Sequence, residues 1–377
     1  MPEYDLSFSS SSSTDGGSYK LMELPPELTK LIEDALANGN HYPPTFTVKG
    51  DPLEDAVLCT TDKTYSMRSV NLSNSILMVT PPVNTSSNSG ENDMVVIRDQ
   101  VNEIIELAPT VPKLHKLSSL LRGREYDDTG EDVNSASSSK RFTYEDARAE
   151  IQASDVELDC GLKDRRILNV NGELRPITPS YLNSLLELLL NLLVSLSLPH
   201  DAAPVEDISS VLADEHEVSR AVSTQVMSWF GEIYEGKWSM DVQAAMKEVG
   251  LGILRNHKHE PIEKQELLAK WKSFVGDTFE SSISLDLLLG NFLVSTSQMG
   301  EEEMLTYFAA SSLPVEPAAR FGDLFLTRTR WKGEDIEQFL ADIAVNNKER
   351  DKLLLKYCRA TTDATGVWYT ARAQYNG

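Results

Sequence analysis

The N-terminal part of the chain alternates apolar and polar residues over short runs, which is typical of β-strands. The segments PTFTVKG, AVLCTTD, KTYSMRSV and NSILMVTPP each predict a strand, and MVVIRDQVNEIIELAP predicts another strand or a strand passing into a helix. Ahead of them, YKLMELPPELTKLIEDAL predicts a short strand and a helix that its two prolines help to initiate. Residues 19–109 are therefore expected to form a small sheet or half-barrel whose edges need covering.

Beyond Pro109 the apolar positions recur with a helical period. Residues 110–140 start with a basic amphipathic stretch, TVPKLHKLSSLLRG, and continue as a polar, flexible linker. Short helices, a hairpin signal at the Asn-Gly pair of RRILNVNGELRPI and a further helix predict a winged-helix module at 141–204. The pattern partly recurs at 205–317, where EVSRAVSTQVMSWFGEIYEG predicts a helix, and at 318–377. The predicted fold class is α+β, a strand-rich domain followed by three mostly helical winged-helix domains.

Two segments are biased in composition. Residues 1–18 are rich in serine and predict a disordered tail. The leucine-rich stretch YLNSLLELLLNLLVSLSL, residues 181–198, approaches a membrane span in length, which requires about 20 mostly apolar residues. However, Asn183, Glu187 and Asn191 recur every four residues and form one polar stripe on a helix. The stretch therefore predicts a helix of the protein core.

The composition is that of a soluble globular protein, with 41% hydrophobic and 25% charged residues among 377. A formal net charge of −23 argues against nucleic acid binding over the whole surface and leaves room for a local basic face. The three cysteines are far apart, with no CxxC spacing, which fits a reducing compartment. The N-terminus shows no signal peptide pattern, so a cytosolic or nuclear protein is expected.

No set of residues with the spacing of an active site is found. The sequence contains neither a phosphate-binding GxxxxGK[ST] loop nor a GxSxG nucleophile motif. The HKHE stretch offers two histidines two positions apart, which is far short of a metal-ligand set. Cys59 lies in an apolar strand, so a core position is expected for it. The sequence predicts a non-enzyme with no catalytic, cofactor-binding or metal-binding residues.

Local basic character is concentrated in the last module. Residues 318–377 hold ten Lys or Arg and eight Asp or Glu, a balance of +2. Lys348, Lys352 and Lys356 are spaced by four and therefore share one face of a predicted helix. Arg359, three positions further on, is expected to extend this stripe. Basic residues also flank Trp331 and precede the first hairpin, where they suggest phosphate contacts. The alternative is a core Trp331 with lysines that only keep the helix soluble. The candidate DNA-binding residues are Arg165, Arg166, Arg328, Arg330, Lys332, Lys348, Lys352, Lys356 and Arg359.

Three segments together resemble a known family. SYKLMELPPEL, DAVLCTTDKTYSMRSVNLSNSILMV and RFGDLFLTRTRWKGEDIEQFLADI with the following LLLKYCR occur in the order and separation of the sister chromatid cohesion Dcc family. Members of that family are accessory subunits of the Ctf-type alternative replication factor C clamp loader. The middle of the chain is similar mainly in its helical layout, and QASDVEL is its clearest local similarity.

The resemblance implies a set of partners. The N-terminal sheet would form a joint β-barrel with the small Ctf partner and the tail of the large clamp-loader subunit. The small replication factor C subunits would be partners only indirectly. The winged-helix domains would bind single- and double-stranded DNA, and one module would dock on the catalytic subunit of DNA polymerase epsilon. Nuclear localisation follows, with no role at a membrane. The candidate partner-binding residues are Val57, Leu58, Lys63, Tyr65, Ile76 and Met78.

The expected function is therefore that of a non-enzymatic scaffold that links the clamp loader to DNA and polymerase in DNA replication and cohesion. The alternative is a winged-helix nucleic-acid-binding regulator of transcription that acts outside a clamp loader. An N-terminal sheet with an incomplete edge distinguishes the two, because a scaffold requires such an edge and a regulator does not.

Overall fold

The computed structural model describes residues 4–8, 19–37, 44–80, 93–127, 141–296 and 302–372. Within these ranges the chain has a mixed α and β fold with twelve α-helices and several small sheets, none of which closes into a barrel. The α+β class is thus confirmed. The chain divides into two units: unit 1 is residues 1–112 with 152–156, and unit 2 is residues 113–151 with 157–377. The predicted linker lies largely outside the described residues, which omit 128–140.

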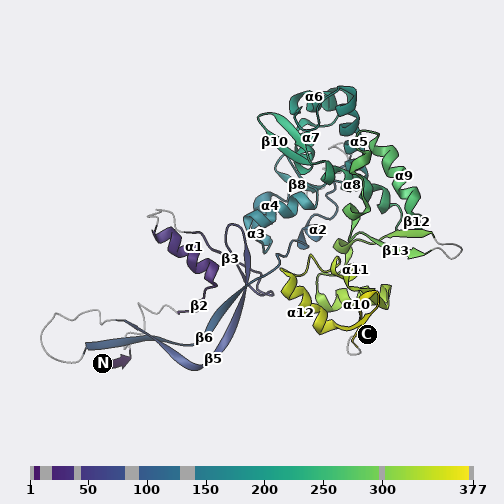
Figure 1. Cartoon of the computed structure of the whole chain (residues 1–377). Coiled ribbons are helices and arrows are strands. Elements are labelled where there is room, and N and C mark those ends of the chain that lie inside the picture. The colour runs from purple at the N-terminus through teal and green to yellow at the C-terminus, as the bar shows by residue number, and fades with distance from the viewer. Residues whose placement is uncertain are drawn as a thin grey trace. The chain divides into compact units, whose positions relative to one another are not determined.

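Unit 1 is one open sheet with a single helix (Figure 1). The strand order is β1-β6-β5-β4-β3, and β2 also pairs with β6. The element bounds are β1 (Tyr4–Phe8), β2 (Leu21–Glu23), α1 (Pro26–Ala37), β3 (Thr47–Lys49), β4 (Val57–Cys59), β5 (Thr64–Thr80) and β6 (Asp93–Pro109). The tail that was predicted to be disordered thus contains β1, which pairs in parallel with the start of β6.

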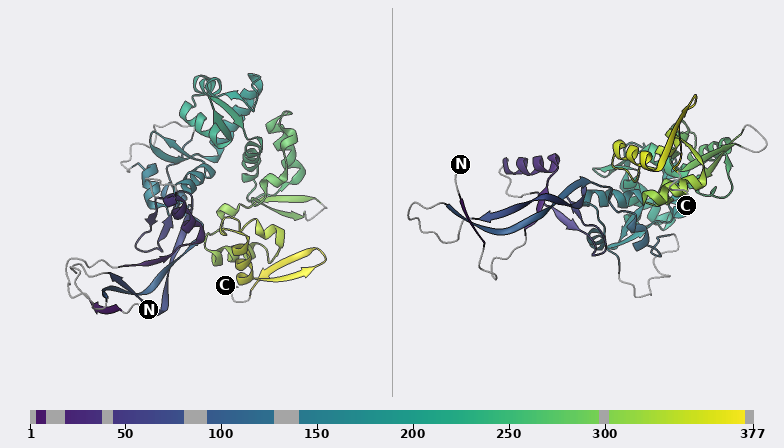
Figure 2. Two further views of the ribbon diagram at one scale, coloured as in Figure 1. Left: turned by 60° about the vertical axis from the view of Figure 1, so that its left-hand side comes forward. Right: turned by 90° about the horizontal axis from the view of Figure 1, so that it is seen from below.

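Strands β5 and β6 are much longer than the sequence pattern predicts. KTYSMRSV and NSILMVTPP were expected as separate strands, yet they form one 17-residue strand, β5. The polar residues between them form no turn, because antiparallel β6 continues past them and the register shifts between Asn71 and Ile76 as a bulge. MVVIRDQVNEIIELAP is likewise all strand. Figure 2 shows the twisted β5–β6 pair from two further sides.

Unit 2 repeats one order of elements: helix, strand, two helices, two strands. In each repeat the first strand pairs with the last, giving the sheets β10-β11-β9, β12-β14-β13 and β15-β17-β16. The first repeat comprises α5 (Pro179–Ser195), β9 (Ala203–Pro204), α6 (Val205–His216), α7 (Arg220–Trp229), β10 (Gly231–Tyr234) and β11 (Lys237–Met240). The second comprises α8 (Val242–Arg255), β12 (Ile262–Glu263), α9 (Lys264–Val275), the 3-10 helices η1 (Glu280–Ser282) and η2 (Leu285–Leu288), β13 (Phe292–Thr296) and β14 (Glu303–Tyr307).

The third repeat follows the short helix η3 (Ala310–Ser312) and comprises α10 (Pro317–Thr327), β15 (Arg330–Lys332), α11 (Gly333–Glu337), α12 (Asn347–Tyr357), β16 (Cys358–Asp363) and β17 (Gly366–Ala371). A reduced version precedes the other three. It contains α2 (Lys116–Leu120), α3 (Tyr144–Glu150), α4 (Asp155–Asp164), β7 (Ile167–Val170) and β8 (Glu173–Pro176). Here a single bridge from Tyr126 to Ile177 stands in place of the first strand. The range 205–317 therefore covers parts of two repeats: it holds the β12-β14-β13 sheet and two strands, β10 and β11, of the sheet whose third strand β9 precedes it.

Among the described residues, the hydrophobic cores of unit 2 include two large ones. One extends from Tyr126 to Leu305 and unites the reduced repeat with the next two, and the other lies within 313–358. Helix α5 belongs to the larger core, in which seven of its leucines are buried: Leu182, Leu185, Leu186, Leu189, Leu190, Leu192 and Leu193. The predicted core helix is thus confirmed. Across the described residues, every helix falls short of the length and apolarity that crossing a membrane requires.

Local sequence signals explain several element boundaries. Thr143 caps α3 with a complete capping box. Asn171 and Gly172 adopt positive φ angles of 53° and 80°, which suit the tight turn of the β7–β8 hairpin. The helix predicted for EVSRAVSTQVMSWFGEIYEG instead ends at Trp229, and GEIY forms β10. Gly231 lies where the helix gives way to the strand. Its φ is 156°, and a Cβ there would lie 2.1 Å from the Ser239 carbonyl oxygen, so this position of the strand needs glycine.

Candidate functional site

The outer edge of β5 is the most exposed binding feature of unit 1. Strand β4 pairs with β5 only over Thr64–Ser66, and the Met67 amide still donates to the Ala56 carbonyl at 3.3 Å. From Arg68 to Thr80, no strand of the described residues pairs with this side of β5. We call it the open β5 edge. Unpaired backbone N–H and C=O groups along a strand offer a ready template for a strand from another chain.

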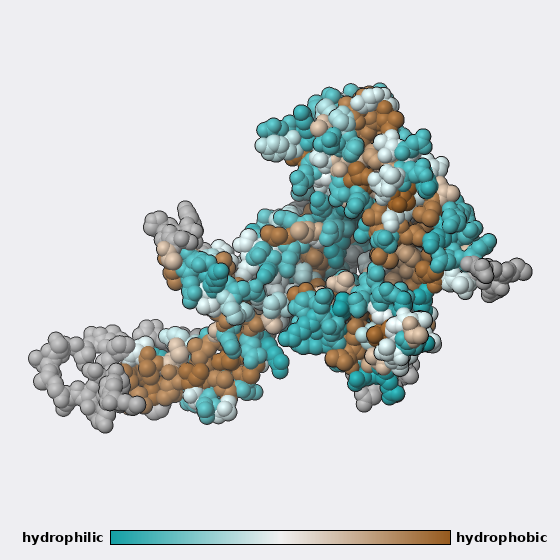
Figure 3. All heavy atoms as spheres, viewed as in Figure 1, coloured by the Kyte–Doolittle hydropathy of each residue, from teal (hydrophilic) through white to brown (hydrophobic). Residues whose placement is uncertain are grey.

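The far part of this edge is apolar on both faces. Ile76 is 40% exposed and its neighbour Leu77 is 41% exposed. Because successive side chains in a strand point to opposite faces, both faces carry exposed apolar groups here. Val79 is 45% exposed, and Figure 3 shows hydrophobic side chains gathered along the β5–β6 pair. Of the candidates from sequence, Ile76 is exposed and Met78 is half-buried. Leu77 and Val79 were missed, although the uninterrupted run ILMV signals a strand that is covered on both faces.

The bulge divides the open β5 edge into a polar and an apolar part. Four residues of β5, Leu72–Ser75, lie opposite Asn102 alone, because Asn71 pairs with Glu103 and Ile76 with Val101. The Ser75 hydroxyl donates to the Asn102 side-chain oxygen at 2.7 Å and accepts from the Gln100 amide at 2.8 Å. These contacts hold the bulge in place, so the change of register is a fixed feature of the strand.

Four other partner candidates are occupied inside unit 1. The side chains of Val57, Leu58 and Tyr65 are only 5%, 6% and 1% exposed, and a partner would reach them only if the unit opened. The Tyr65 hydroxyl donates to Glu27 at 2.9 Å, and Lys63 forms an ion pair with the same carboxylate at 2.8 Å. The Lys63 ammonium and then the Tyr65 hydroxyl hold the Glu27 pKa below its usual value. These residues fasten α1 to the β4–β5 corner.

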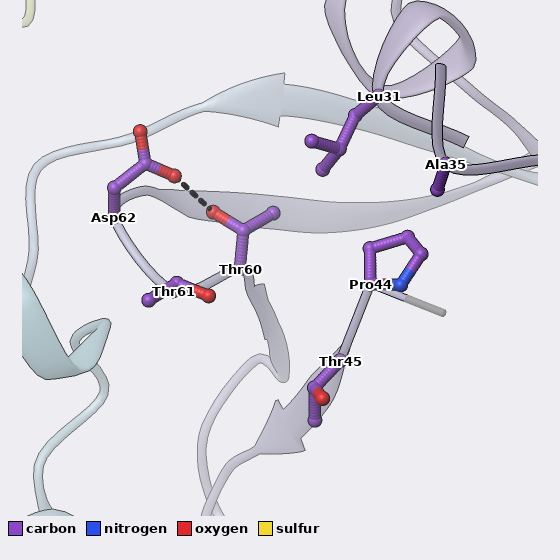
Figure 4. Close-up of a pocket in the computed structure, with 7 residues that line it drawn as sticks. All are labelled: Leu31, Ala35, Pro44, Thr45, Thr60, Thr61 and Asp62. Atoms are coloured by element: carbon purple, nitrogen blue, oxygen red, sulfur yellow. Dashed lines mark hydrogen bonds between the residues drawn. The ribbon is translucent and has the colours of Figure 1, made fainter. Parts of the chain in front are cut away.

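Unit 1 also contains a hollow of about 320 Å³ beside α1 (Figure 4). Its lining consists of Leu31, Ala35, Pro44, Thr45, Thr60, Thr61 and Asp62. Among the described residues that line it, Asp62 is the single titratable one, and its carboxylate already accepts a hydrogen bond from the Thr60 hydroxyl at 2.9 Å. These described lining residues therefore form no reactive pair of acid and base. Elsewhere too, the described residues contain no group of three His, Cys, Asp or Glu side chains with metal-binding geometry.

Two of the three cysteines, Cys59 and Cys358, occupy buried positions that give little reactivity, whereas Cys160 is exposed. Cys59 is 3% exposed in β4, as predicted for a core residue. Cys358 is equally buried, and that burial raises its thiol pKa to about 12. A thiol with so high a pKa carries almost no thiolate near neutral pH.

The sheet of the third repeat has a core face and a cationic outer face. Trp331 pairs with Tyr369 and is 1% exposed, and its indole donates to the Leu324 carbonyl at 2.9 Å. The alternative reading of Trp331 as a core residue is thus confirmed. On the outer face, Thr370 lies directly between Arg330 and Arg359 in the register of the three strands. Arg359 was expected to extend the lysine stripe, but α12 ends at Tyr357 and Arg359 belongs to β16.

Three of the predicted cations beside Trp331 already have protein partners. Arg330 pairs with Asp363 at 2.6 Å and stacks 4.2 Å from the centre of the Trp368 ring. Hydrogen bonds from Thr365, together with Arg330, hold the Asp363 pKa far below its ordinary value. Half-buried Arg328 donates to the Val294 carbonyl, and Lys332 pairs with Glu334. These cations stabilise the module, and a phosphate would have to compete with their present partners.

Two lysines of α12, Lys348 and Lys352, are more available. Helix α12 starts at a cap in which the Asn346 side chain accepts from the Glu349 amide at 3.0 Å. The four-residue spacing places Lys348, Lys352 and Lys356 along one exposed stripe, as predicted. Lys348, Lys352 and Arg359 form no ion pair with any other described residue, while Lys356 lies 5.0 Å from the Tyr357 ring centre. This stripe is the cationic surface best suited to a phosphate backbone.

The arginine pair before the first hairpin is arranged differently. Arg166 bonds to Glu248 at 3.3 Å and lies 4.5 Å from the centre of the Phe230 ring. Glu248 is 4% exposed and also accepts from Arg255 at 2.7 Å. Arg166 therefore joins the β7–β8 hairpin to α8 and is not free to meet DNA, whereas Arg165 remains exposed at the end of α4.

An open strand edge and a cationic helix stripe are the surfaces of the described residues that are suited to binding another macromolecule. Comparison with known sequences identifies the family. Residues 19–340 match the family described as "Sister chromatid cohesion protein Dcc1". This chain belongs to that family.

Curated relatives cover nearly all of the chain. Human "Sister chromatid cohesion protein DCC1" is 26% identical over 368 residues, 94% of this chain and 89% of the relative. The Xenopus laevis protein of the same name is 28% identical over 94% of this chain and 89% of its own length. The Saccharomyces cerevisiae protein is 24% identical over 95% and 94%. The resemblance seen in the sequence is thus confirmed, and it extends from yeast to vertebrates.

Proposed function

We propose that this chain is a non-enzymatic scaffold subunit in sister chromatid cohesion, acting within a Ctf-type alternative clamp loader in the nucleus. Membership of the Dcc1 family supports the role in cohesion. The open β5 edge is the observation that carries the scaffold role. ATP hydrolysis belongs to the other subunits, consistent with the absence of a phosphate-binding loop from the sequence.

The proposed partners of the open β5 edge are the small Ctf subunit and the tail of the large clamp-loader subunit. Their strands extend the sheet of unit 1 by main-chain hydrogen bonds, and their apolar side chains cover Ile76, Leu77 and Val79. Burial of apolar area contributes about 25 cal/mol for each Å² removed from water. Exposed apolar groups beside unpaired backbone therefore give such a partner both affinity and register. The small replication factor C subunits are reached only through the large subunit.

The repeats of unit 2 are proposed to be winged-helix modules. Their order of helix, strand, two helices and two strands, with the first strand paired to the last, is the order that this fold uses. In helix-turn-helix proteins the last helix of the motif enters the major groove. The corresponding helix in the third repeat is α12 with its three lysines, whereas α7 in the first repeat carries only Arg220, which pairs with Glu206 at 2.5 Å. Binding to single- and double-stranded DNA is therefore assigned to α12, and docking on the catalytic subunit of DNA polymerase epsilon to another part of the chain.

A winged-helix regulator of transcription accounts equally well for unit 2. It leaves the long β5–β6 pair without a purpose, since DNA binding needs no unpaired apolar strand. The open edge therefore favours the scaffold.

Co-expression with the two Ctf-type subunits tests this proposal. Leu77→Glu with Val79→Glu places two charges on the open β5 edge and should abolish co-purification of both subunits. Leu53→Glu is the matched control, because Leu53 is a 95% exposed leucine of the same unit outside its strands, and this variant should co-purify normally. Normal recovery of both subunits with the double variant would refute the proposed interface.

A further inference from the structure

The QASDV segment, residues 152–156, belongs to unit 1 although it lies between two helices of the other unit. It starts where α3 ends and includes the first two residues of α4. We call these five residues the strap. It is the start of QASDVEL, the local similarity for which neither the strand edge nor the lysine stripe provides a reason.

Hydrogen bonds attach the strap to three places in unit 1. The Gln152 side-chain amide donates to the Asp55 carbonyl at 2.8 Å, just before β4. In the opposite direction, the Lys49 ammonium of β3 donates to the Ala153 carbonyl at 2.7 Å. At the β4–β5 corner, the Ser154 amide donates to the Thr64 hydroxyl oxygen at 3.0 Å. The Val156 amide donates to the Thr61 carbonyl at 3.2 Å.

The first three residues of the strap are as deeply buried as the core, whereas Val156 is 45% exposed. Gln152, Ala153 and Ser154 are 2%, 0% and 1% exposed, and Thr64 is 2% exposed. Unit 1 also leaves room for it at Gly50, where a Cβ would lie 3.3 Å from the Gln152 amide nitrogen and 3.1 Å from the Ala56 Cα. Buried polar groups are costly unless they are paired. Losing the strap would therefore expose or orphan several groups around the first residue of β5.

From these contacts we propose that the strap fixes the backbone of the β4–β5 corner, from which the open β5 edge continues. The order of this edge then depends on the folding of α3 and α4, between which the strap lies. The strap has no regular structure before Asp155, so the two helices must fix its ends. If either helix frays, one end of the strap is no longer held, so ordering the strap against unit 1 costs more conformational entropy. The β4–β5 corner then becomes less stable. A segment far along the chain thus makes the partner-binding edge conditional on a folded neighbour.

The regulation proposed here rests on the proposed function of the open β5 edge, but its test needs no partner. The test is hydrogen–deuterium exchange of the full chain, which measures how fast the backbone amides of residues 57–71 exchange with solvent. Thr64→Val removes the acceptor for the Ser154 amide while keeping the shape of the side chain, and Thr64→Ser retains it. We expect exchange in 57–71 to rise about tenfold or more in Thr64→Val, and to stay within about twofold of the wild type in Thr64→Ser.

A second pair of variants tests the dependence on α3. Thr143→Ala removes the α3 cap, and Asn346→Ala removes the equivalent cap of α12. A lost cap weakens a helix by about 1 kcal/mol. Thr143→Ala should therefore raise exchange in 57–71 severalfold, and Asn346→Ala should leave it unchanged.

Unchanged exchange in 57–71 for both Thr64→Val and Thr143→Ala would overturn the proposal, as would an equal effect of Asn346→Ala. Failure of the Ctf-type subunits to bind the wild-type chain would instead count against the proposed function. The two can therefore fail separately.

Discussion

Replacing Arg320 should open the third repeat locally. Arg320 lies in α10 with its side chain fully buried, and its guanidinium donates to the carboxylate of Asp342 and to four backbone carbonyls. The carbonyls belong to Pro314 at 2.6 Å, Phe339 at 2.8 Å, and Ala310 and Leu313 at 3.2 Å each. One side chain thus joins the segment before α10 to the turn after α11. We expect Arg320→Met to lose these bonds while keeping most of the apolar volume.

The expected cost follows from burial. Removing one partner of a buried ion pair costs about 3–5 kcal/mol. The Asp342 side chain is 45% exposed and water can solvate its carboxylate, so this part of the cost is small. The Ala310 carbonyl still accepts from the Leu313 amide at 3.1 Å, but the other three carbonyls lose the guanidinium, at about 1 kcal/mol each. A loss of about 3 kcal/mol in local stability is therefore expected, which is about a hundredfold in an opening equilibrium.

Hydrogen exchange of the full chain is the suitable assay, because several units need not unfold as one two-state transition. Peptides from residues 310–345 should exchange about a hundredfold faster in Arg320→Met, and those from α5 should not change. Arg320→Lys should lie close to Arg320→Met, since an ammonium cannot reproduce the planar fork of donors. Arg359→Met, at an exposed arginine of the same module, is the control. Exchange in 310–345 within about threefold of the wild type would refute the reasoning.

Three further outcomes are expected. Charge reversal to Glu at the three α12 lysines should weaken DNA binding and reduce the log–log salt slope by about 0.9 for each duplex phosphate that is no longer neutralised, as fluorescence anisotropy over a salt series measures; an unchanged slope would leave them as a solubilising face. Glu27→Gln should destabilise unit 1 only above about pH 4.5, because the Lys63 ion pair lowers the Glu27 pKa and that stability is lost as pH falls through it. Thermal melts at pH 7 and pH 3.5 check this, and an equal effect at both would contradict it. Gly252→Ala should cost about 1–3 kcal/mol in chemical denaturation, since its Cβ would lie 2.1 Å from the Asn183 amide; a neutral variant would show that α5 and α8 separate easily.

Elements with strong local signals were predictable from the sequence. The α5 leucines recur with a helical period, and Glu187 and Asn191 of its polar stripe remain exposed, so a buried helix followed directly. The Asn-Gly turn of β7–β8 and the cap of α3 depend on chemistry within four residues. Gly250 and Gly252 lie in the helical pattern of EVGLGILR, and in the structure they meet Trp271 and Asn183 at close helix contacts. In these cases the nearest neighbours in sequence supply the deciding energy.

Features that depend on distant segments were not predictable in the same way. The polar step between two apolar runs in β5 has the composition of a turn, and only the pairing with β6 turns it into a bulge. Likewise, QASDV has no periodicity that would assign it to a sheet about a hundred residues earlier. Both features are decided by backbone groups of other segments, which contribute hydrogen bonds without any signature in side-chain pattern.

The cations show why a site is harder to predict than an element. From the sequence alone, Arg330 and Lys352 are both expected to be exposed cations, Arg330 beside an aromatic residue and Lys352 on an amphipathic helix. In the fold, Arg330 stacks on Trp368 and pairs with Asp363, whereas Lys352 projects from α12 without a carboxylate partner among the described residues. Spacing decides which direction a side chain takes, and tertiary pairing decides whether its charge is still available. The charges and strand edges that are available for binding are therefore those that no other part of the fold pairs with. They can be identified only once the pairs within the fold are known.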